Sequence, residues 1–107
     1  AGNASMMAFT RAIGSRSIFN GVRVVGVNPG PVETDRIQTV MRQKAQAEFG
    51  DEARSREYYA NWPMNRFAKP EEVADLIVFL ASDRASYISG TVVTIDGAMV
   101  NNNSILG

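Results

Sequence analysis

The 107-residue chain carries 11 basic and 11 acidic side chains, and it has neither cysteine nor histidine. This length fits one small domain, and the composition excludes disulfides, thiolate chemistry, a histidine-based triad and most zinc sites. Balanced charge without runs of one sign argues against nucleic acid and against a polybasic membrane contact. No apolar stretch reaches the ~18 residues of a membrane span and no signal-peptide pattern opens the chain, so we expect a cytoplasmic protein without a metal site.

The first element is a predicted helix from Ala4 to Ile13, with Gly14 as its expected stop. Ala4, Ala8 and Ala12 recur at every fourth residue and form a smooth stripe of small side chains on one face, here called the alanine stripe. Because the helix has little polar surface, two interpretations stay open. It is either an internal helix covered on more than one side, or a helix whose stripe lets another subunit's helix approach closely.

The apolar run Val22–Val27 predicts a buried parallel strand, because it does not alternate with polar residues. Pro29-Gly30-Pro31 then fixes the direction of the chain past the carboxyl end of this strand, which is where open α/β sheets bind ligands. There Val32 and Thr34 would offer a backbone amide, a carbonyl and a hydroxyl to an uncharged amide or hydroxyl group. The alternative is an ordinary turn capped by Thr34 or Asp35.

Residues 35–61 predict two weakly amphipathic helices that are separated at Gly50-Asp51, with the second ending near Tyr59. After a stiff exit, such helices suggest a flap over a site and not a core element. The flap's bulky side chains suit either an apolar part of a substrate or simple packing: Met41, Phe49, Tyr58, Tyr59 and Trp62. The tyrosines at 58, 59 and 87 lack a lysine at helical spacing that would lower their pKa for proton transfer, so we interpret them as amphipathic packing residues.

The clearest helix runs from Pro70 to Leu80, with proline at its first position, two glutamates in its first turn and apolar residues at helical spacing. Ser82-Asp83 ends it. A short β-branched strand, Thr91–Ile95, follows, and Asp96-Gly97 turns the chain out of it. Helices alternating with strands indicate an α/β fold.

Four motifs in this order resemble the C-terminal part of the short-chain dehydrogenase/reductase family, whose fold is a Rossmann-type, doubly wound parallel sheet. They are NPGPVET at 28–34, RFAKPEEVA at 66–74, ISGT at 88–91 and IDGA at 95–98. The helix around AFTRA at 8–12 is similar to the helix that follows the family's Tyr-x-x-x-Lys pair. The resemblance implies that residues 1–107 are the C-terminal part of one Rossmann-fold domain, in which residues 35–62 form the substrate-binding lid.

The resemblance also implies an oxidoreductase that uses NAD or NADP to interconvert an alcohol and a carbonyl by hydride transfer. In the family, the segment matching Pro29 and Gly30 lies against the nicotinamide half of the cofactor. The residue matching Val32 bonds the carboxamide through its backbone, and the hydroxyl matching Thr34 contacts the carboxamide or a phosphate. This chain would then supply the wall on the nicotinamide side and the lid.

The family's glycine-rich loop and its catalytic Ser and Tyr would lie upstream of Ala1, so no residue of this chain is assigned as catalytic and the chain alone is expected to be inactive. The start without Met, inside a helical pattern, also suggests a piece of a longer chain. Asn3 falls where the family has its catalytic Lys. Either that Lys lies a few residues upstream, or this member has an altered or weakened site. Asn3 also motivates a second hypothesis, a non-catalytic binding or scaffold subunit. An unrelated α/β binding module is a third option.

The partners that the resemblance implies are the upstream half of the same subunit, a small-molecule substrate and further copies in a homodimer or homotetramer. The elements that would pack between copies are 4–13, 73–80 and 91–95. Two strands and a few helices cannot form a complete parallel sheet, and an isolated strand of valines would expose apolar faces. We therefore expect the chain to aggregate unless it is bound to its upstream half or held in an oligomer.

Overall fold

The computed structural model describes residues 2–99, with side chains from residue 4 onward. The helices and strands are α1 (Gly2–Ser17), β1 (Gly26–Pro29), α2 (Asp35–Phe49), α3 (Pro70–Ala81) and β2 (Val92–Ile95). Four 3₁₀ helices join them: η1 (Ile18–Asn20), η2 (Glu52–Tyr59), η3 (Pro63–Asn65) and η4 (Asp83–Ala85). The described chain divides into two compact units, the first of residues 2–28 and 74–95, and the second of residues 29–73 and 96–99.

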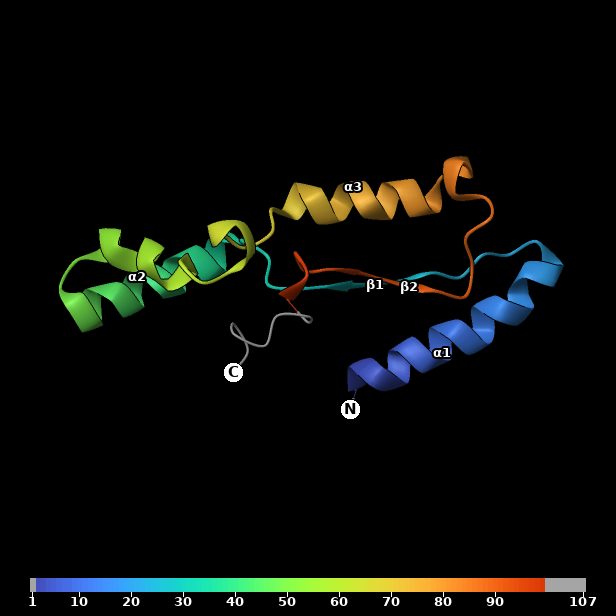
Figure 1. Ribbon diagram of the computed structural model, residues 1–107, viewed down its shortest axis with the longest axis horizontal. Coiled ribbons are helices and arrows are strands. Elements are labelled where there is room, and N and C mark those ends of the chain that lie inside the picture. Colours follow the sequence, from blue (N-terminus) through green and yellow to red (C-terminus); the bar gives the residue numbers. More distant parts are fainter. Residues whose placement is uncertain (1, 100–107) are drawn as a thin grey trace. The chain divides into compact units, whose positions relative to one another are not determined.

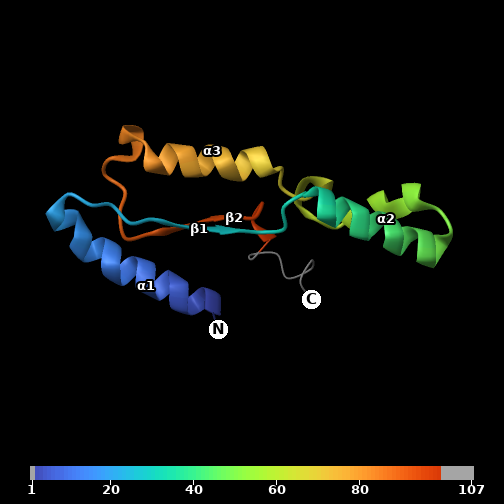
Figure 2. The ribbon, with the colours of Figure 1, turned by 180° about the vertical axis from the view of Figure 1, so that it is seen from behind.

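The first unit is built on a pair of hydrogen-bonded strands, β1 and β2. Both strands run in the same direction, with α1 on one side of the pair and α3 on the other (Figures 1 and 2). Parallel strands between helices are the arrangement that the alternation of helices and strands predicts. The α/β fold class is therefore confirmed.

The expected helix stop at Gly14 is wrong, because α1 continues to Ser17. Gly14 is buried, and a Cβ placed on it would lie 2.4 Å from the Cα of Gly90 and 2.7 Å from the carbonyl oxygen of Val24. The glycine is thus required by the close approach of two backbones and not by a turn. The positive φ that ends this helical stretch occurs later, at Gly21, where φ is 76°.

The expected strand at Val22–Val27 is shifted, since regular pairing begins only at Gly26. Before that point the backbone pairs with a turn. The amide of Val24 donates to the hydroxyl of Ser89 at 3.2 Å, and its carbonyl accepts from the amide of Gly90 at 2.8 Å. Val24, within the predicted run, is thus held by Ser89-Gly90 and not by a strand partner.

Helix α1 buries a narrow face and leaves most of its apolar surface exposed. Thr10 is buried, and its hydroxyl donates to the carbonyl of Met6 at 2.8 Å. The side chains of Met6, Phe9 and Ile13 are 65%, 60% and 42% exposed, and the alanine stripe is exposed as well. Within the described residues the helix is covered on one side only, so its coverage on a second side also stays a prediction. Docking of another helix on this face stays a prediction.

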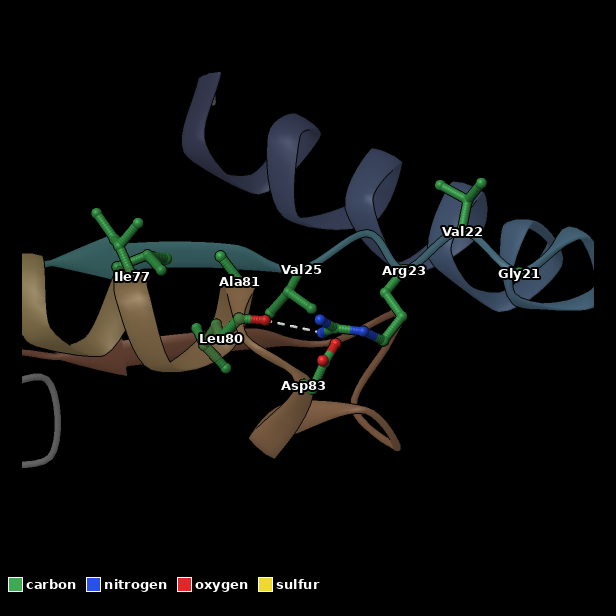
Figure 3. Close-up of a pocket in the computed structure, with 9 residues that line it drawn as sticks. Gly21, Val22, Arg23, Val25, Ile77, Leu80, Ala81 and Asp83 are labelled. Carbon is green, nitrogen blue, oxygen red and sulfur yellow. Dashed lines mark hydrogen bonds between the residues drawn. The ribbon is translucent and has the colours of Figure 1, made fainter.

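Arg23 secures the C-terminal end of α3. Its Nη1 donates to the carbonyl of Leu80 at 2.8 Å and to that of Ile88 at 3.4 Å, and its Nη2 donates to the carbonyl of Ser82 at 3.1 Å. Figure 3 shows the guanidinium reaching the Leu80 carbonyl. Carbonyls at a helix end lack hydrogen-bond donors within the helix, and here the guanidinium of Arg23 provides the donors.

The second unit contains α2 and η2, which pack against each other. Thr34 caps the start of α2, and Gly50, with φ of 70°, caps its end. Ala45 on α2 is completely buried, and the rings of Phe49 and Tyr58 stack across the two helices at 6.0 Å. The expected separation at Gly50-Asp51 is confirmed, although the second helix is of the 3₁₀ type.

The later elements are confirmed nearly residue for residue. Helix α3 begins at Pro70, ends at Ala81 and is followed by a turn that Ser82 caps. In the turn after β2, the carboxylate of Asp96 accepts from the amide of Ala98 at 2.9 Å, and Gly97 has a φ of 64°. These elements are set by local signals, which is why the sequence suffices to predict them.

We predict that Gly14→Ala destabilises the protein by about 1–3 kcal/mol or more, because its Cβ would meet the backbone of Gly90, which cannot move aside as a side chain can. Thermal unfolding would measure this as a lower melting temperature. The control is Ser15→Ala on the exposed side of the same helical turn, which we expect to change the stability by no more than about 0.5 kcal/mol. Equal stability of both variants would contradict the close approach.

Candidate functional site

The chain that leaves β1 is held by a short parallel bridge in the second unit, in which Val32 lies opposite Ala68. The carbonyl of Pro31 accepts from the amide of Ala68 at 3.0 Å, and the amide of Glu33 donates to the carbonyl of Ala68 at 2.7 Å. In a parallel bridge the two residues that flank the central one make the hydrogen bonds. The N–H and C=O of Val32 itself are therefore directed to the opposite side.

Gly30 is required by the approach of the turn after β2. A Cβ placed on Gly30 would lie 2.9 Å from the Cβ of Asp96 and 3.1 Å from its Cα. Pro29, the last residue of β1, is exposed. The two prolines restrict the backbone on either side of this contact. The segment Pro29-Gly30-Pro31, by which the chain leaves β1, is therefore restricted by its two prolines and by the close approach of Gly30 to Asp96.

Thr34 has a structural role, because its Oγ1 accepts from the amide of Ile37 at 3.2 Å and so caps α2. The alternative interpretation of the exit as a capped turn is thus confirmed. A hydroxyl offers one proton and two lone pairs, so the cap leaves the proton of Thr34 available as a donor. Thr34 is exposed, and its contact with a cofactor stays a prediction.

Arg66 and Glu72 hold the segment that contains Ala68. Arg66 Nη1 lies 2.7 Å from Glu72 Oε1 and Nη2 lies 3.0 Å from Oε2, while Nη1 also donates to the carbonyl of Phe67 at 3.1 Å. The amide of Lys69 donates to Glu72 Oε1 at 2.7 Å. The hydrogen bonds from Arg66 and then from Lys69 lower the pKa of Glu72 from 4.5 to about 2.

An aromatic group joins the end of η2 to the same segment. Phe67 is only 7% exposed, and the rings of Tyr59 and Trp62 meet it edge to face at centroid distances of 4.8 and 5.1 Å. The hydroxyl of Tyr59 donates to Glu33 Oε1 at 3.3 Å. Burial, followed by the negative charge of Glu33, raises the pKa of Tyr59.

The interpretation of the tyrosines as amphipathic packing residues is confirmed for Tyr58 and Tyr59 and is wrong for Tyr87. The rings of Tyr58 and Tyr59 pack on Phe49 and Phe67, and their hydroxyls donate to Glu48 and Glu33. Tyr87 is fully exposed and packs against little. Desolvation, and then the hydrogen bond to Glu48, raise the pKa of Tyr58 to about 12. Carboxylate partners 10 and 26 residues away give no short-range signal in the sequence.

Two hollows lie in the first unit. The larger, of about 590 Å³, is lined by residues from 21–27 and 77–83 (Figure 3), and the smaller, of about 280 Å³, is lined by residues from α1, β1 and β2. None of the four predicted cofactor residues lines either hollow. Asn3 lies in α1, but its side chain is outside the described part of the chain. Among the described residues, three potential metal ligands never come together, and no helix has the length and apolarity to cross a bilayer.

Comparison with known proteins supports one assignment. Residues 1–99 match the family model described as enoyl-(acyl carrier protein) reductase. The structure of an oxidoreductase of the short chain dehydrogenase/reductase family from Burkholderia thailandensis superposes with a TM-score of 0.77 and 26% identity, over 96% of this chain and 37% of that one. This chain belongs to the short-chain dehydrogenase/reductase family.

Other members of the family are also similar. A glucose and ribitol dehydrogenase homolog from Oryza sativa subsp. japonica is 38% identical over 98 residues, which are 92% of this chain and 30% of the relative. The structure of L-sorbose reductase from Gluconobacter frateurii, complexed with NADPH and L-sorbose, has a TM-score of 0.80 and 31% identity over 92% of this chain and 38% of that one. This short-chain dehydrogenase/reductase chain thus spans about a third of the length of the proteins it matches, and its α/β architecture is a portion of their Rossmann-type fold.

We predict that Glu72→Gln lowers the melting temperature at pH 7, because it removes the charged partner of Arg66. The pKa of Glu72 is lowered in the folded state, so the stabilisation is complete above about pH 4.5 and is lost as the pH falls towards 2. The difference in melting temperature between the wild type and Glu72→Gln should therefore become smaller as the pH falls over that range. Glu71→Gln is the control, since it removes the same charge from the same helical turn and leaves the Arg66 pair intact. A difference that is constant with pH would contradict this role.

Proposed function

We propose that this chain is the C-terminal part of an NAD(P)-dependent oxidoreductase that interconverts an alcohol and a carbonyl by hydride transfer. Membership of the short-chain dehydrogenase/reductase family supports the proposal, as does the similarity to L-sorbose reductase, whose structure contains NADPH. The chain would supply the wall on the nicotinamide side and the lid over the substrate. The upstream half of the subunit would supply the dinucleotide-binding loop and the catalytic Ser and Tyr.

The observation that carries this proposal is the orientation of the Val32 backbone. Its N–H and C=O are directed away from Ala68, because the bridge uses the groups of Pro31 and Glu33. One donor and one acceptor on neighbouring atoms match the carboxamide of nicotinamide, which carries one acceptor and two donor hydrogens. Thr34 adds a hydroxyl whose proton is not used by the helix cap. The residues present therefore fit the nicotinamide half of NAD or NADP.

The bound cofactor would supply or accept the hydride, and the groups of this chain would orient it. Pro29 and Gly30 are held beside the turn after β2 by the close contact of Gly30 with Asp96, which fixes the wall against which the ring would lie. Helices α2 and η2, within residues 35–62, would close over the substrate and exclude water. A backbone that is already held in place loses little conformational freedom when the cofactor binds.

The alternative is a non-catalytic binding or scaffold subunit, and it rests on Asn3 at the position of the family's catalytic Lys. An amide keeps a hydrogen bond but lacks the positive charge that lowers the pKa of the catalytic Tyr. The residues upstream of Ala1 discriminate between the two. A Tyr four residues before a Lys would support the enzyme, and the absence of both would support the scaffold.

A homodimer or homotetramer in the cytoplasm is part of the same proposal. Exposed apolar side chains support the association of copies through α1 and α3. On α1 they are Met6, Phe9 and Ile13, and on α3 they are Ile77, Val78 and Phe79, all between 42% and 68% exposed. Surfaces of this kind are covered by another chain or by the rest of the subunit in most soluble proteins.

The direct test compares the complete subunit with the 107-residue chain. We expect the complete subunit to bind NADH or NADPH, measured by cofactor fluorescence, and to reduce a carbonyl substrate from a panel that includes sugars and acyl ketones. The chain alone should show no turnover, because the groups for dinucleotide binding and proton transfer are not among its residues. Turnover by the purified chain alone would contradict the proposal, and so would the absence of cofactor binding by the complete subunit.

Thr34→Val tests the predicted cofactor contact. Loss of one neutral hydrogen bond should raise the dissociation constant of the cofactor by about two- to tenfold in the complete subunit, while Thr34→Ser should restore it. Because Thr34 also caps α2, the control is Ser82→Ala, which removes the cap of η4 outside the flap, where the Ser82 hydroxyl accepts from the Arg84 amide at 3.3 Å. That variant should lower the melting temperature without changing the affinity. Unchanged affinity in Thr34→Val would leave Thr34 as a helix cap alone.

A further inference from the structure

One polar contact links the flap to the segment proposed to bind the cofactor. The hydroxyl of Tyr59, at the end of η2, donates to Oε1 of Glu33 at 3.3 Å. Glu33 lies between Val32 and Thr34, the two residues proposed to contact nicotinamide. Both Tyr59 and Glu33 are half-buried, whereas most residues of this unit are exposed. The contact therefore ties a helix of the flap to the centre of the proposed binding segment.

A second contact involves the other end of the same side chain. The Tyr59 ring meets the buried ring of Phe67 edge to face at 4.8 Å, and Phe67 precedes Ala68, the bridge partner of Val32. The backbone of Glu33 is itself bound to Ala68, at 2.7 Å. Tyr59 thus contacts both strands of the bridge, one through its hydroxyl and the other through its ring. No other tyrosine in the described chain does so.

We propose that Tyr59 and Glu33 form a positioning pair that holds the flap and the backbone of Val32–Thr34 in the geometry that binds the nicotinamide half of the cofactor. This inference rests on the proposed function. Neither side chain needs to touch the cofactor, since the effect passes through the backbone on either side of Glu33. If the binding geometry is populated only part of the time, the apparent dissociation constant rises by the inverse of that fraction.

The chemistry of the pair suits a lasting contact. A tyrosine hydroxyl is a donor and a carboxylate is an acceptor with two oxygens, and a hydrogen bond to an ionised acceptor is stronger than one between neutral groups. The pKa of Tyr59 is raised by burial and by Glu33, so the hydroxyl keeps its proton at neutral pH. The guanidinium of Arg42 also acts on Tyr59, in the opposite direction.

The neighbouring tyrosine provides a matched control. Tyr58 lies in the same 3₁₀ helix, and its hydroxyl also donates to a glutamate, but that residue is Glu48 of α2. Its ring stacks on Phe49, also in α2. The contacts of Tyr58 therefore lie within the flap, whereas those of Tyr59 join the flap to the bridge. The same change, from tyrosine to phenylalanine, can be made at both positions.

The experiment measures the dissociation constant and KM of NADH and NADPH, together with kcat, in the complete subunit. Tyr59→Phe keeps the ring on Phe67 and removes the hydrogen bond, so we expect the cofactor dissociation constant and KM to rise by about three- to tenfold while kcat stays within about twofold. Glu33→Gln should give a smaller rise. The double variant should be no worse than Tyr59→Phe, because both changes remove one interaction. Tyr58→Phe should leave the cofactor affinity unchanged.

The outcomes separate this inference from the proposed function. If the wild-type subunit binds neither cofactor, the proposed function is wrong. If it binds one and Tyr59→Phe binds it equally well, the positioning pair is wrong and the proposed function stands. The positioning pair is also wrong if Tyr58→Phe loses as much cofactor affinity as Tyr59→Phe, or if the losses of affinity add in the double variant. It is equally wrong if only kcat falls. If Tyr59→Phe does not fold, the comparison of Glu33→Gln with Tyr58→Phe still tests the pair. A loss of cofactor affinity confined to Glu33→Gln supports the pair, and the absence of such a loss overturns it.

Discussion

The parallel bridge between Val32 and Ala68 is the constraint on which the proposed site depends. Along an extended chain, successive residues direct their backbone polar groups to opposite sides. Once Pro31 and Glu33 are bound to Ala68, the N–H and C=O of Val32 must face the other way. Proline at 31 suits this position because it has no N–H to donate and the bridge requires only its carbonyl. The segment's hydrogen-bonding direction thus follows from two backbone bonds and is independent of the Val32 side chain.

Elements defined by neighbours in the sequence could be predicted from the sequence, whereas those defined by distant residues could not. The proline and glutamates that open α3, and the Gly50-Asp51 break after α2, act within one or two helical turns. Gly14 differs, because its neighbour is Gly90. A glycine after a helical run indicates a stop when only local conformation is considered, yet the same residue also permits backbones to touch. Only the fold distinguishes the two, and the late start of β1 has the same origin in Ser89-Gly90.

The candidate site shows the same division. The sequence indicated the stiff exit and the cap at Thr34, because prolines and a threonine before a helix are local signals. It gave no indication that Gly30 passes Asp96, or that Tyr59 reaches Glu33 across 26 residues. Spacing between such partners follows no helical or strand period. Side chains that tie two elements together are thus the part of a site that a single sequence conceals most.

The burial pattern supports the proposal that further elements cover these ones. Only five apolar side chains of the described chain are buried, namely Ala45, Phe67, Leu80, Ala85 and Met99, and no large one is buried completely. The valines of 22–27, which suit a strand covered on both faces, are half-buried at best, with Val22 53% exposed. Stability in water comes mainly from apolar area removed from solvent, at about 25 cal/mol per Å². Exposed apolar residues that could supply such area lie on α1, on α3 and at Val22 before β1. A sequence patterned for two-sided burial thus supports the proposal that further elements of the subunit, or further copies of it, cover them.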